Sequence, residues 1–502
     1  MERQFMVSRV SAPTMRQLGD VIPLPAAVRP DSTADFRIPS GVSVSAAPAA
    51  AAVADELGVL LRRVTGFAVP VKEEEPENGG FRLRLDESVD EAKSPESYRL
   101  DIAADGVTLS APAAAGLFAG LQTLRQLLPE TAGGEVTIPG GRIDDEPRFA
   151  YRGTMLDLAR HFYEPADIRT FIDTIAQFKI NHLHLHLTDD QGWRLEIDGW
   201  PRLTEVSGGE GTGIDGQGPG FLTAAEYADL IAYGETRFVT IVPEIDLPGH
   251  VNAAQVAYPE LTCDGEPVQP RTDAEVGYSS LCAGKEETYA FVEDVIRVVA
   301  GLTPGPFLHI GGDEALSTTA EDYRTFMTRV LPMVGRYGKR AIGWHEMAAV
   351  ELPPTAVPQY WRIEPADDGV ARAAAAGHQV IMSPADRSYL DMKYDESSPL
   401  GLDWAGLVGV ERSYDWDPAD RLPGVGEESL LGVEAPLWSE TLRSRADVEF
   451  MVFPRLLAIA EIGWTPRADR SWPEFRRRLA EFGPRWTAQG VNFHRSGEVD
   501  WK

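Results

Sequence analysis

Two adjacent carboxylates stand out among the residues that could do chemistry. They close the segment His309-Ile310-Gly311-Gly312-Asp313-Glu314. Hydrolysis of a glycosidic bond normally needs one carboxyl group that protonates the leaving oxygen and a second that acts as base or nucleophile. Adjacent residues of a regular strand point to opposite faces, so both acids reach one sugar only if the backbone leaves strand geometry, a freedom that glycines supply. Because sequence neighbours cannot easily flank one bond from both sides, the spacing predicts different tasks for the two acids.

Other polar clusters follow further apolar, strand-like segments. They are Asp157-Leu158-Ala159-Arg160-His161-Phe162, Thr188-Asp189-Asp190, Pro243-Glu244-Ile245-Asp246-Leu247-Pro248-Gly249-His250, Trp344-His345-Glu346, Tyr360-Trp361-Arg362, Tyr389-Leu390-Asp391 with Trp404, and Trp438-Ser439-Glu440. A single acid at the end of a strand usually caps a helix or pairs with an arginine. Clusters at the ends of so many strands instead predict one common site.

Tryptophan recurs in these clusters, at positions 344, 361 and 438. A tryptophan face covers the apolar C–H face of a pyranose, while carboxylates and arginine bind its hydroxyls. A single tryptophan in a barrel is as often part of the core. Three of them at strand ends, together with the acids, predict an aromatic cage around a sugar.

The elements that must position these clusters alternate between strand and helix from Phe149 onward. The predicted strands are Gly153–Leu158, His182–Leu187, Phe238–Ile245, Phe307–Ile310, Ala341–Trp344, Val357–Trp361, Gln379–Met382 and Leu430–Ala435. The predicted helices include Pro165–Phe178, Ala224–Tyr233, Glu286–Val299, Ala320–Tyr337, Gly369–Ala376 and Val448–Ile462. This alternation fits a (β/α)₈ barrel better than an open sheet, and barrel enzymes place their chemistry where the strands end.

The segment before the barrel has a different pattern. Helical spacing covers Ala49–Thr65 and Ala113–Leu128, Phe81–Leu85 alternates like a half-buried strand, and Asp105-Gly106 predicts a hairpin turn. The 502 residues are too many for one ordinary domain. The predicted fold is therefore α/β, with a (β/α)₈ TIM barrel catalytic domain at residues 148–502 and a smaller α+β domain at residues 1–147.

Composition excludes several classes of protein. The chain has 47 basic and 77 acidic side chains, a formal net charge of −30, which argues against nucleic acids and anionic membranes as partners. A hydrophobic share of 43% is that of a globular protein with a sizeable core. No apolar run approaches the roughly 20 residues of a membrane helix.

The two cysteines exclude a disulfide-rich scaffold and a cysteine-rich metal module. Cys263 and Cys282 lie close in sequence, and two separate thiols or a local disulfide are equal alternatives. The first residues lack the apolar region of a secretory signal. This predicts a cytoplasmic protein; the alternative is a processed or recloned form of a secreted one, which a Cys263–Cys282 disulfide would favour.

Two patterns suggest a cofactor but have simpler explanations. One predicted strand carries histidine at every second position, at 182, 184 and 186, so the three side chains should point to the same face. Metal-ligating histidines can have this spacing, but hydrogen bonding inside the barrel is the simpler interpretation. The segment Gly211-Thr212-Gly213-Ile214-Asp215-Gly216 has dinucleotide-site spacing but follows no apolar strand, and Thr223 and Glu226 beyond it form an ordinary capping box. We expect no metal and no cofactor.

The segment His309–Glu314, with Arg160-His161-Phe162 and Trp438-Ser439-Glu440, closely resembles the glycoside hydrolase family 20 β-N-acetylhexosaminidases. The resemblance covers nearly the whole chain and implies exo-acting hydrolysis of terminal β-linked GlcNAc or GalNAc, with chitooligosaccharides among the substrates. It also implies retaining, substrate-assisted catalysis, in which the substrate's acetamido oxygen attacks its own anomeric carbon to form an oxazolinium ion. No protein nucleophile is then needed, which resolves the spacing of the two acids.

The resemblance also implies residue roles. Glu314 would be the general acid/base with a raised pKa, Asp313 would orient and stabilise the acetamide, and Tyr389 would bind its oxygen. The sugar-binding residues would be Trp344, Trp361, Trp404, Trp438, Arg160, Asp391 and Glu440, in a pocket closed at one end. Asp190 and His250, with Asp246 behind them, would tune the acid.

The alternative functions are a sugar-binding protein and a chitinase of another family. A sugar-binding protein without turnover would use the tryptophans but has no need of a buried acid such as Glu314. A family 18 chitinase would share the substrate class, but its D-x-x-D-x-D-x-E strand is absent from this sequence.

Overall fold

The computed structural model describes residues 16–76, 79–86, 94–130, 136–364 and 368–502. The chain divides into two compact units between Glu146 and Pro147. Among the described residues, no helix is long and apolar enough to cross a membrane.

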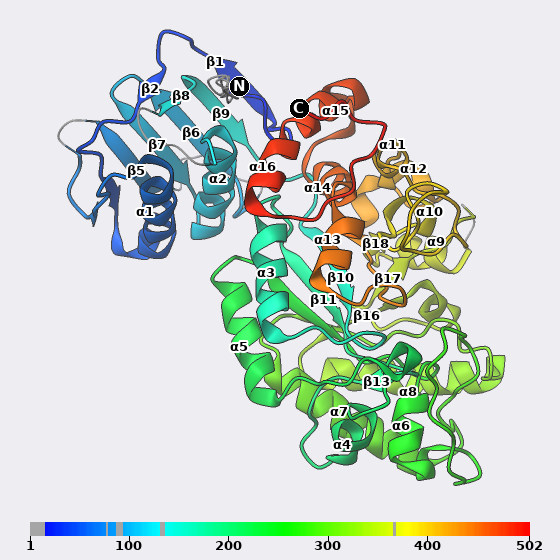
Figure 1. Cartoon of the computed structure of the whole chain (residues 1–502). Helices are drawn as coiled ribbons and strands as arrows, with labels where there is room; N and C mark the ends of the chain where they lie inside the picture. The colour runs from blue at the N-terminus through cyan, green and yellow to red at the C-terminus, as the bar shows by residue number, and fades with distance from the viewer. Residues whose placement is uncertain (1–15, 77–78, 87–93, 131–135, 365–367) are drawn as a thin grey trace, which may run out of the picture. The chain divides into compact units, whose positions relative to one another are not determined.

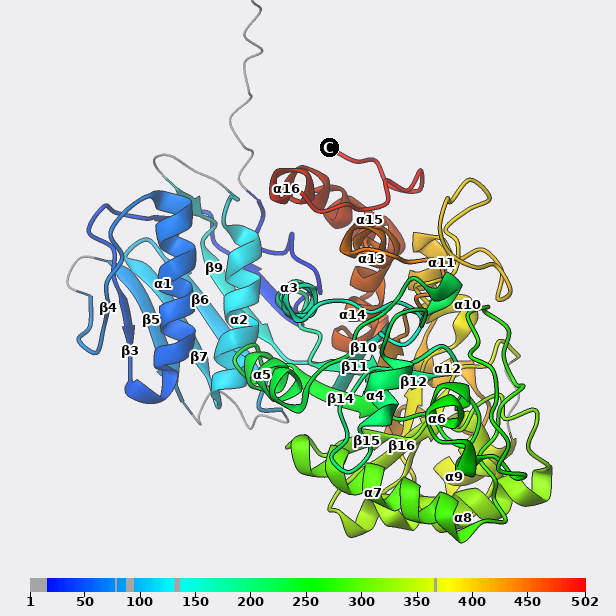
Figure 2. The ribbon, with the colours of Figure 1, turned by 60° about the horizontal axis from the view of Figure 1, so that its bottom comes forward.

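The first unit is a mixed sheet with two helices, so the predicted α+β domain is confirmed. The sheet has the order β1-β9-β6-β7-β5-β3-β4, and a separate pair joins β2 to β8. The strands are β1 (Ala27–Pro30), β2 (Phe36–Arg37), β3 (Val44–Ala46), β4 (Val71–Lys72), β5 (Gly80–Leu85), β6 (Tyr98–Ala103), β7 (Gly106–Ala111), β8 (Thr137–Ile138) and β9 (Gly141–Asp145). Figure 2 shows the helices α1 (Ala51–Thr65) and α2 (Ala114–Leu127) side by side over one face of the sheet.

The second unit is a closed barrel of eight parallel strands, in the order β10-β11-β14-β15-β16-β17-β18-β19 (Figure 1). The strands are β10 (Tyr151–Asp157), β11 (His182–His186), β14 (Thr240–Glu244), β15 (Phe307–His309), β16 (Arg340–Trp344), β17 (Val357–Tyr360), β18 (Val380–Met382) and β19 (Leu430–Ala435). The short strands β12 (Thr188–Asp189) and β13 (Gly192–Trp193) form a hairpin at the rim. The predicted barrel is confirmed.

Helices follow most of the barrel strands. They are α3 (Pro165–Ala176), α4 (Arg202–Ser207), α5 (Ala224–Glu235), α6 (Asn252–Ala257), α7 (Glu286–Leu302), α8 (Ala320–Arg336), α9 (Asp368–Ala375), α10 (Ala385–Ser388), α11 (Val410–Tyr414), α12 (Pro418–Arg421), α13 (Arg445–Val452), α14 (Arg455–Trp464), α15 (Trp472–Ala480) and α16 (Phe482–Gln489). The expected capping box at the start of α5 is confirmed, because Thr223 Oγ1 accepts from Glu226 N at 3.2 Å and Glu226 Oε2 accepts from Thr223 N at 2.9 Å.

Two predicted boundaries are wrong for local reasons. The expected helix Val448–Ile462 is two helices, α13 and α14, which separate at Phe453 and Pro454 because proline has no N–H for helical hydrogen bonding. The third barrel strand begins at Thr240 rather than Phe238, whose φ of 54° is incompatible with a strand.

The barrel interior has an apolar and a polar layer. Side chains from seven strands, among them Tyr151, Val242, Phe307 and Leu431, form a buried apolar cluster. His184, Glu244, His309 and Glu434, from four of the strands, are fully buried polar residues of the interior. The fold therefore places ionisable groups directly beneath the ends of the strands.

Candidate active site

The loop after β15 holds the two adjacent acids in a backbone that has left strand geometry, as the sequence predicts. Gly311 and Gly312 have φ values of 64° and 100°, and Glu314 itself has a φ of 42°. A Cβ atom on Gly311 would lie 1.7 Å from Asp246 Oδ1, and the N–H of Gly312 donates to that oxygen at 3.1 Å. The turn therefore needs glycine for both its conformation and its close packing.

A cavity of about 330 Å³ lies at this rim of the barrel. Its size is within the range of small-molecule sites. It is lined by Arg160, His250, Ala274, Val276, Asp313, Glu314, Trp361, Tyr389, Asp391, Leu402, Trp404, Trp438 and Glu440. Ten residues of the predicted site thus meet around one cavity, although they come from segments far apart in the sequence.

Three predicted site residues do not line this cavity. Trp344 is fully buried behind Trp438, at 5.8 Å between ring centroids, and its indole N–H donates to Glu244 Oε1 at 3.0 Å. Asp246 lies beneath the acid loop, where it accepts the Gly312 N–H. Asp190 accepts hydrogen bonds from Asn252 N at 2.9 Å and Ser279 Oγ at 2.5 Å, so it supports the loop beside His250.

His250 is hydrogen-bonded to Asp189 rather than to Asp190. Its Nδ1 lies 3.1 Å from Asp189 Oδ1 and 3.9 Å from Asp190 Oδ2. Asp189 also contacts Arg160 Nη2 at 2.9 Å and His186 Nε2 at 2.8 Å. The sequence pattern includes Asp189, but nothing in it distinguishes the two neighbouring aspartates.

The aromatic residues form one wall of the cavity. The rings of Trp361 and Tyr389 are stacked at 6.5 Å, and Trp404 packs edge-on against both at 5.9 and 5.8 Å. Trp438 lies 6.4 Å from Tyr389, and the guanidinium of Arg160 lies over its ring at 5.0 Å. Such flat apolar surfaces suit the C–H faces of a sugar ring.

Unsatisfied carboxylate oxygens lie in the same cavity. Asp391 is 2% exposed, and neither of its carboxylate oxygens has a hydrogen-bond partner among the described residues. The same holds for Glu440 Oε2. Burial, followed by the charge of Glu440, raises the pKa of Asp391 well above its usual value. Buried polar atoms are normally paired, so these oxygens indicate a ligand with several hydroxyl groups.

The adjacent acids have different surroundings. Burial, and then the charge of Asp313, raises the pKa of Glu314, whose side chain is 35% exposed. Asp313 lies near Asp246, and burial raises the pKa of both carboxyl groups. The pKa of Asp246 is raised well above its usual value, with the charge of Asp313 as the second cause. His250 Nε2 lies 3.8 Å from both Asp313 Oδ2 and Glu314 Oε2.

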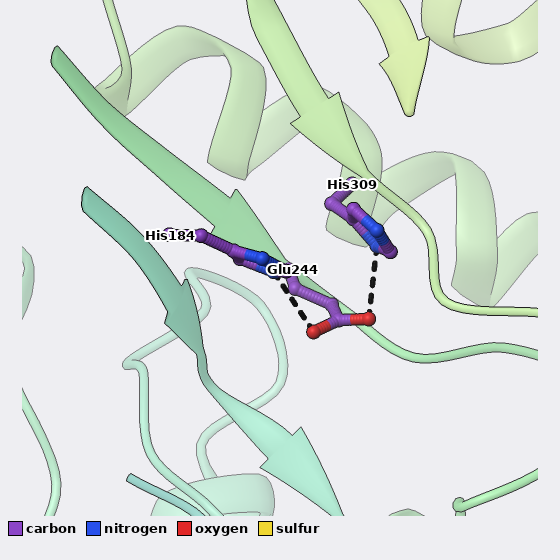
Figure 3. Close-up of side chains that lie close together, drawn as sticks. All are labelled: His184, Glu244 and His309. Atoms are coloured by element: carbon purple, nitrogen blue, oxygen red, sulfur yellow. Dashed lines mark ion pairs between the residues drawn. The ribbon is translucent and has the colours of Figure 1, made fainter. Parts of the chain in front are cut away.

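The histidines of β11 face the barrel interior, as predicted, and are hydrogen-bonded there. His184 Nδ1 is hydrogen-bonded to Glu434 Oε1 at 2.9 Å and His186 Nδ1 to Glu244 Oε2 at 2.5 Å. Glu244 also forms ion pairs with His184 Nε2 and His309 Nδ1, both at 2.9 Å (Figure 3). Burial lowers the pKa of His184, but Glu434 and Glu244 outweigh it and raise that pKa to about 9. These contacts fit the hydrogen-bonded interpretation.

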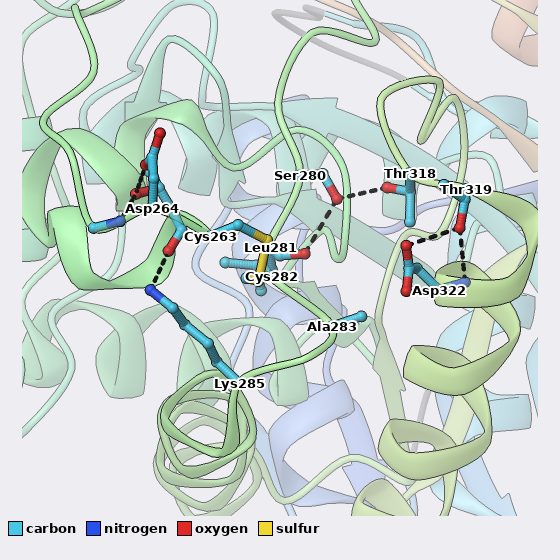
Figure 4. The surroundings of a disulfide bond; sticks show 12 residues. Cys263, Asp264, Ser280, Leu281, Cys282, Ala283, Lys285, Thr318, Thr319 and Asp322 are labelled. Atoms are coloured by element: carbon cyan, nitrogen blue, oxygen red, sulfur yellow. Dashed lines mark hydrogen bonds between the residues drawn. A yellow bond between two sulfur atoms is a disulfide. The ribbon is translucent and has the colours of Figure 1, made fainter.

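A disulfide joins Cys263 and Cys282, which decides between the two alternatives that the sequence leaves open (Figure 4). The loop it closes contributes Ala274 and Val276 to the cavity wall. Ser280, beside the disulfide, is hydrogen-bonded to Thr318 of the segment after Glu314 at 2.6 Å. The cross-link thus anchors one side of the candidate site.

Comparison with known proteins agrees with this geometry. Residues 149–467 match the glycosyl hydrolase family 20 catalytic domain, and residues 19–146 match domain 2 of the same family. A β-N-acetylhexosaminidase of Cellulomonas fimi is 42% identical over 462 residues, which cover 91% of this chain and 92% of the relative. A β-hexosaminidase of Porphyromonas gingivalis is 38% identical, over 84% of this chain and 57% of that relative.

Solved structures of this family share the whole fold. The family 20 β-N-acetylhexosaminidase of Streptomyces coelicolor A3(2) has a TM-score of 0.93 and 47% identity, over 97% of this chain and 99% of that one. A mutant Streptomyces plicatus β-hexosaminidase in complex with product (GlcNAc) has a TM-score of 0.92 and 46% identity, over 98% and 99%. The chain therefore belongs to glycosyl hydrolase family 20, as a glycoside hydrolase with β-N-acetylhexosaminidase activity.

Proposed function

We propose that the enzyme removes single terminal, non-reducing β-linked GlcNAc or GalNAc residues, with retention of configuration, by substrate-assisted catalysis. The observation that carries the proposal is that the adjacent acids Asp313 and Glu314 line the same cavity, where burial raises the pKa of Glu314. Exo action is supported by the unsatisfied oxygens of Asp391 and Glu440, which suit the hydroxyls of a terminal sugar.

The reaction then proceeds in two steps. The acetamido oxygen of the substrate attacks the anomeric carbon while Glu314 transfers its proton to the departing glycosidic oxygen. Asp313 accepts a hydrogen bond from the acetamide N–H and stabilises the positive charge of the oxazolinium ion, and the Tyr389 hydroxyl donates to the acetamide oxygen. In the second step Glu314 takes a proton from water, which attacks the anomeric carbon and restores the acetamide.

The other residues of the site bind the sugar or support the residues that contact it. Arg160, Asp391 and Glu440 bind the sugar hydroxyls, and Trp361, Trp404 and Trp438 cover its apolar faces. His250, bonded to Asp189, lies close enough to both acids to influence their charge. Trp344 supports Trp438 from behind and is held by Glu244.

The comparisons support N-acetylglucosamine-containing substrates. A related structure from Vibrio harveyi is described as an exo β-N-acetylglucosaminidase in complex with N-acetylglucosamine, and a relative from the same organism is an N,N'-diacetylchitobiase. We therefore include chitooligosaccharides among the substrates.

The test compares aryl β-GlcNAc, β-GalNAc and β-glucose substrates at equal concentration. We expect turnover of the first two and none of the third, because glucose has no acetamido group to act as nucleophile. The control is Asp313→Asn, which should lower kcat on the N-acetyl substrates by about 10²-fold or more. Cleavage of the glucoside at a similar rate, or a wild-type kcat for the variant, would exclude the mechanism.

We also propose that the protein works in an oxidising compartment, against the cytoplasmic expectation from its first residues. The support is the Cys263–Cys282 disulfide, since cytosolic thiols are usually kept reduced. Thiol alkylation of the protein taken directly from its producing cells tests this: two reactive thiols per chain would reject it.

A further inference from the structure

A second cavity, of about 750 Å³, shares Glu314 and Trp361 with the sugar cavity. Its lining also includes Arg324 of α8, Arg362 after β17 and Arg372 of α9, and we call it the arginine cavity. If Glu314 protonates a glycosidic oxygen, the leaving group extends from that oxygen away from the sugar cavity. The arginine cavity is the adjoining space that receives it.

The three arginines lack the partners that arginines usually have. Within the described part of the chain, no hydrogen bond or ion pair involves the guanidinium of Arg324, Arg362 or Arg372. On the same helix as Arg324, Arg329 and Arg336 pair with Glu286 and Glu293 at 2.6 and 2.7 Å. In a chain with a net charge of −30, three cations around one cavity with no partner among the described residues are a local exception.

Acids also line the arginine cavity, and burial raises the pKa of two of them. Glu346 accepts a hydrogen bond from the Trp361 indole at 3.2 Å, and burial followed by the charge of Asp313 raises its pKa to about 8. Burial also raises the pKa of Glu314. Asp368, by contrast, is exposed to solvent. Among the described lining residues, the three arginines therefore face one exposed acid, Asp368.

We propose that the arginine cavity binds an anionic leaving group, so that the enzyme prefers N-acetylhexosamine β-linked to a sugar that carries a carboxylate or a sulfate. The inference rests on the proposed exo-hydrolysis and names the class of substrate within it. Guanidinium groups bind carboxylates and sulfates through paired N–H donors, which a neutral sugar cannot match. Arg324, Arg362 and Arg372 would then determine leaving-group specificity without acting on the reacting bond.

The test uses three disaccharides with GlcNAc β-linked to glucose, to glucuronic acid or to a 6-sulfated glucose, together with aryl β-GlcNAc. We expect kcat/KM at low ionic strength to be about fivefold or more higher for an acidic disaccharide than for the neutral one, since each exposed ion pair contributes up to about fivefold. The ratio should fall toward one in 0.5 M salt, where charges are screened. The uronate and sulfate substrates distinguish the two anions.

The variants are Arg324→Gln, Arg372→Gln and the double variant, and Arg336→Gln on α8 is the matched control. We expect the acidic-to-neutral ratio of kcat/KM to fall with each cavity variant and to stay at the wild-type value in the control. An equal ratio for wild type and all four variants, or a wild-type preference for the neutral disaccharide, would overturn the inference. If wild type does not cleave aryl β-GlcNAc, the proposed function itself fails; if it does, only the anionic preference is rejected.

Discussion

Glu314 combines a carboxyl group of raised pKa with a position on the cavity wall. Its pKa is raised first by burial and then by Asp313, while His250 opposes the shift. The conformation of its backbone, with a φ of 42°, is unusual for a residue with a side chain. Such strain persists where the surrounding structure holds it, and it commonly accompanies function.

The proton on Glu314 gives a testable pH dependence. Since the raised pKa keeps the acid protonated to higher pH, cleavage of poor leaving groups should be present below that pKa and lost above it. Glu314→Gln should lower kcat/KM for chitobiose by about 10²–10⁴-fold, spare activated aryl substrates more, and abolish the alkaline limb of their pH profile. Rate measurements from pH 4 to 9 test this, with exposed Glu321→Gln as control; equal small losses on both substrates would contradict the assignment.

Asp391 should lower the free energy of unfolding of the sugar-free enzyme near neutral pH, and it should be needed for substrate binding. Its pKa is higher in the folded than in the unfolded state, so the native protein binds more protons and its free energy of unfolding falls as pH rises above the ordinary value of about 4. Asp391→Asn should therefore gain Tm relative to wild type between pH 4 and 7, while kcat/KM falls about 10–100-fold through lost hydroxyl contacts. Thermal unfolding without sugar tests this. Exposed Asp403→Asn, in the same segment, should show no relative gain.

The loop after β15 shows how an element positions the chemistry. His309 is the last strand residue, and the next five residues turn so that Asp313 reaches Asp246 while Glu314 faces both cavities. The sequence predicts this departure from strand geometry because Gly311-Gly312 precede the acids. It does not predict the break between α13 and α14, because the apolar periodicity continues through Pro454.

Gly311→Ala should damage both stability and activity. The new Cβ atom would lie 1.7 Å from Asp246 Oδ1, on a backbone with a φ of 64°, so we expect a loss of about 2 kcal/mol or more in the free energy of unfolding and of most activity. Gly335→Ala in α8, where a Cβ would meet nothing within 4 Å, should instead be neutral or stabilising by about 0.5–1 kcal/mol. Denaturant unfolding of the pair tests this; similar stabilities would show that the loop accommodates a side chain.

At the scale of the whole molecule, barrel closure brings the site together. The first and last barrel strands, β10 and β19, pair in parallel, and Asp157 Oδ2 at the end of β10 accepts the N–H of Ser439 at 3.1 Å. This contact sets Arg160 beside Glu440 in one cavity. The Cys263–Cys282 loop then closes one side of that cavity with Ala274 and Val276.

Removal of the disulfide should therefore affect both stability and substrate binding. The two cysteines are 19 residues apart in sequence. For a loop of this length, chain entropy predicts that removal of the disulfide lowers the free energy of unfolding by about 3 kcal/mol. The double variant Cys263→Ala/Cys282→Ala should unfold at lower temperature and show a higher KM, because the cavity wall loses its anchor. Thermal scans and kinetics with and without reductant test this: wild type should respond to reductant and the double variant should not.

The polar clusters, the alternation of strands and helices and the division into two parts could be predicted because they depend on short-range patterns and on the order of the chain. Other features required distances between strands that are remote in sequence. They include the hydrogen bond of His250 to Asp189 rather than Asp190, the burial of Trp344 behind Trp438 and the gathering of three arginines around the cavity beside Glu314. Each depends on which side chains come within contact distance of one another. Only the packing of the closed barrel decides that.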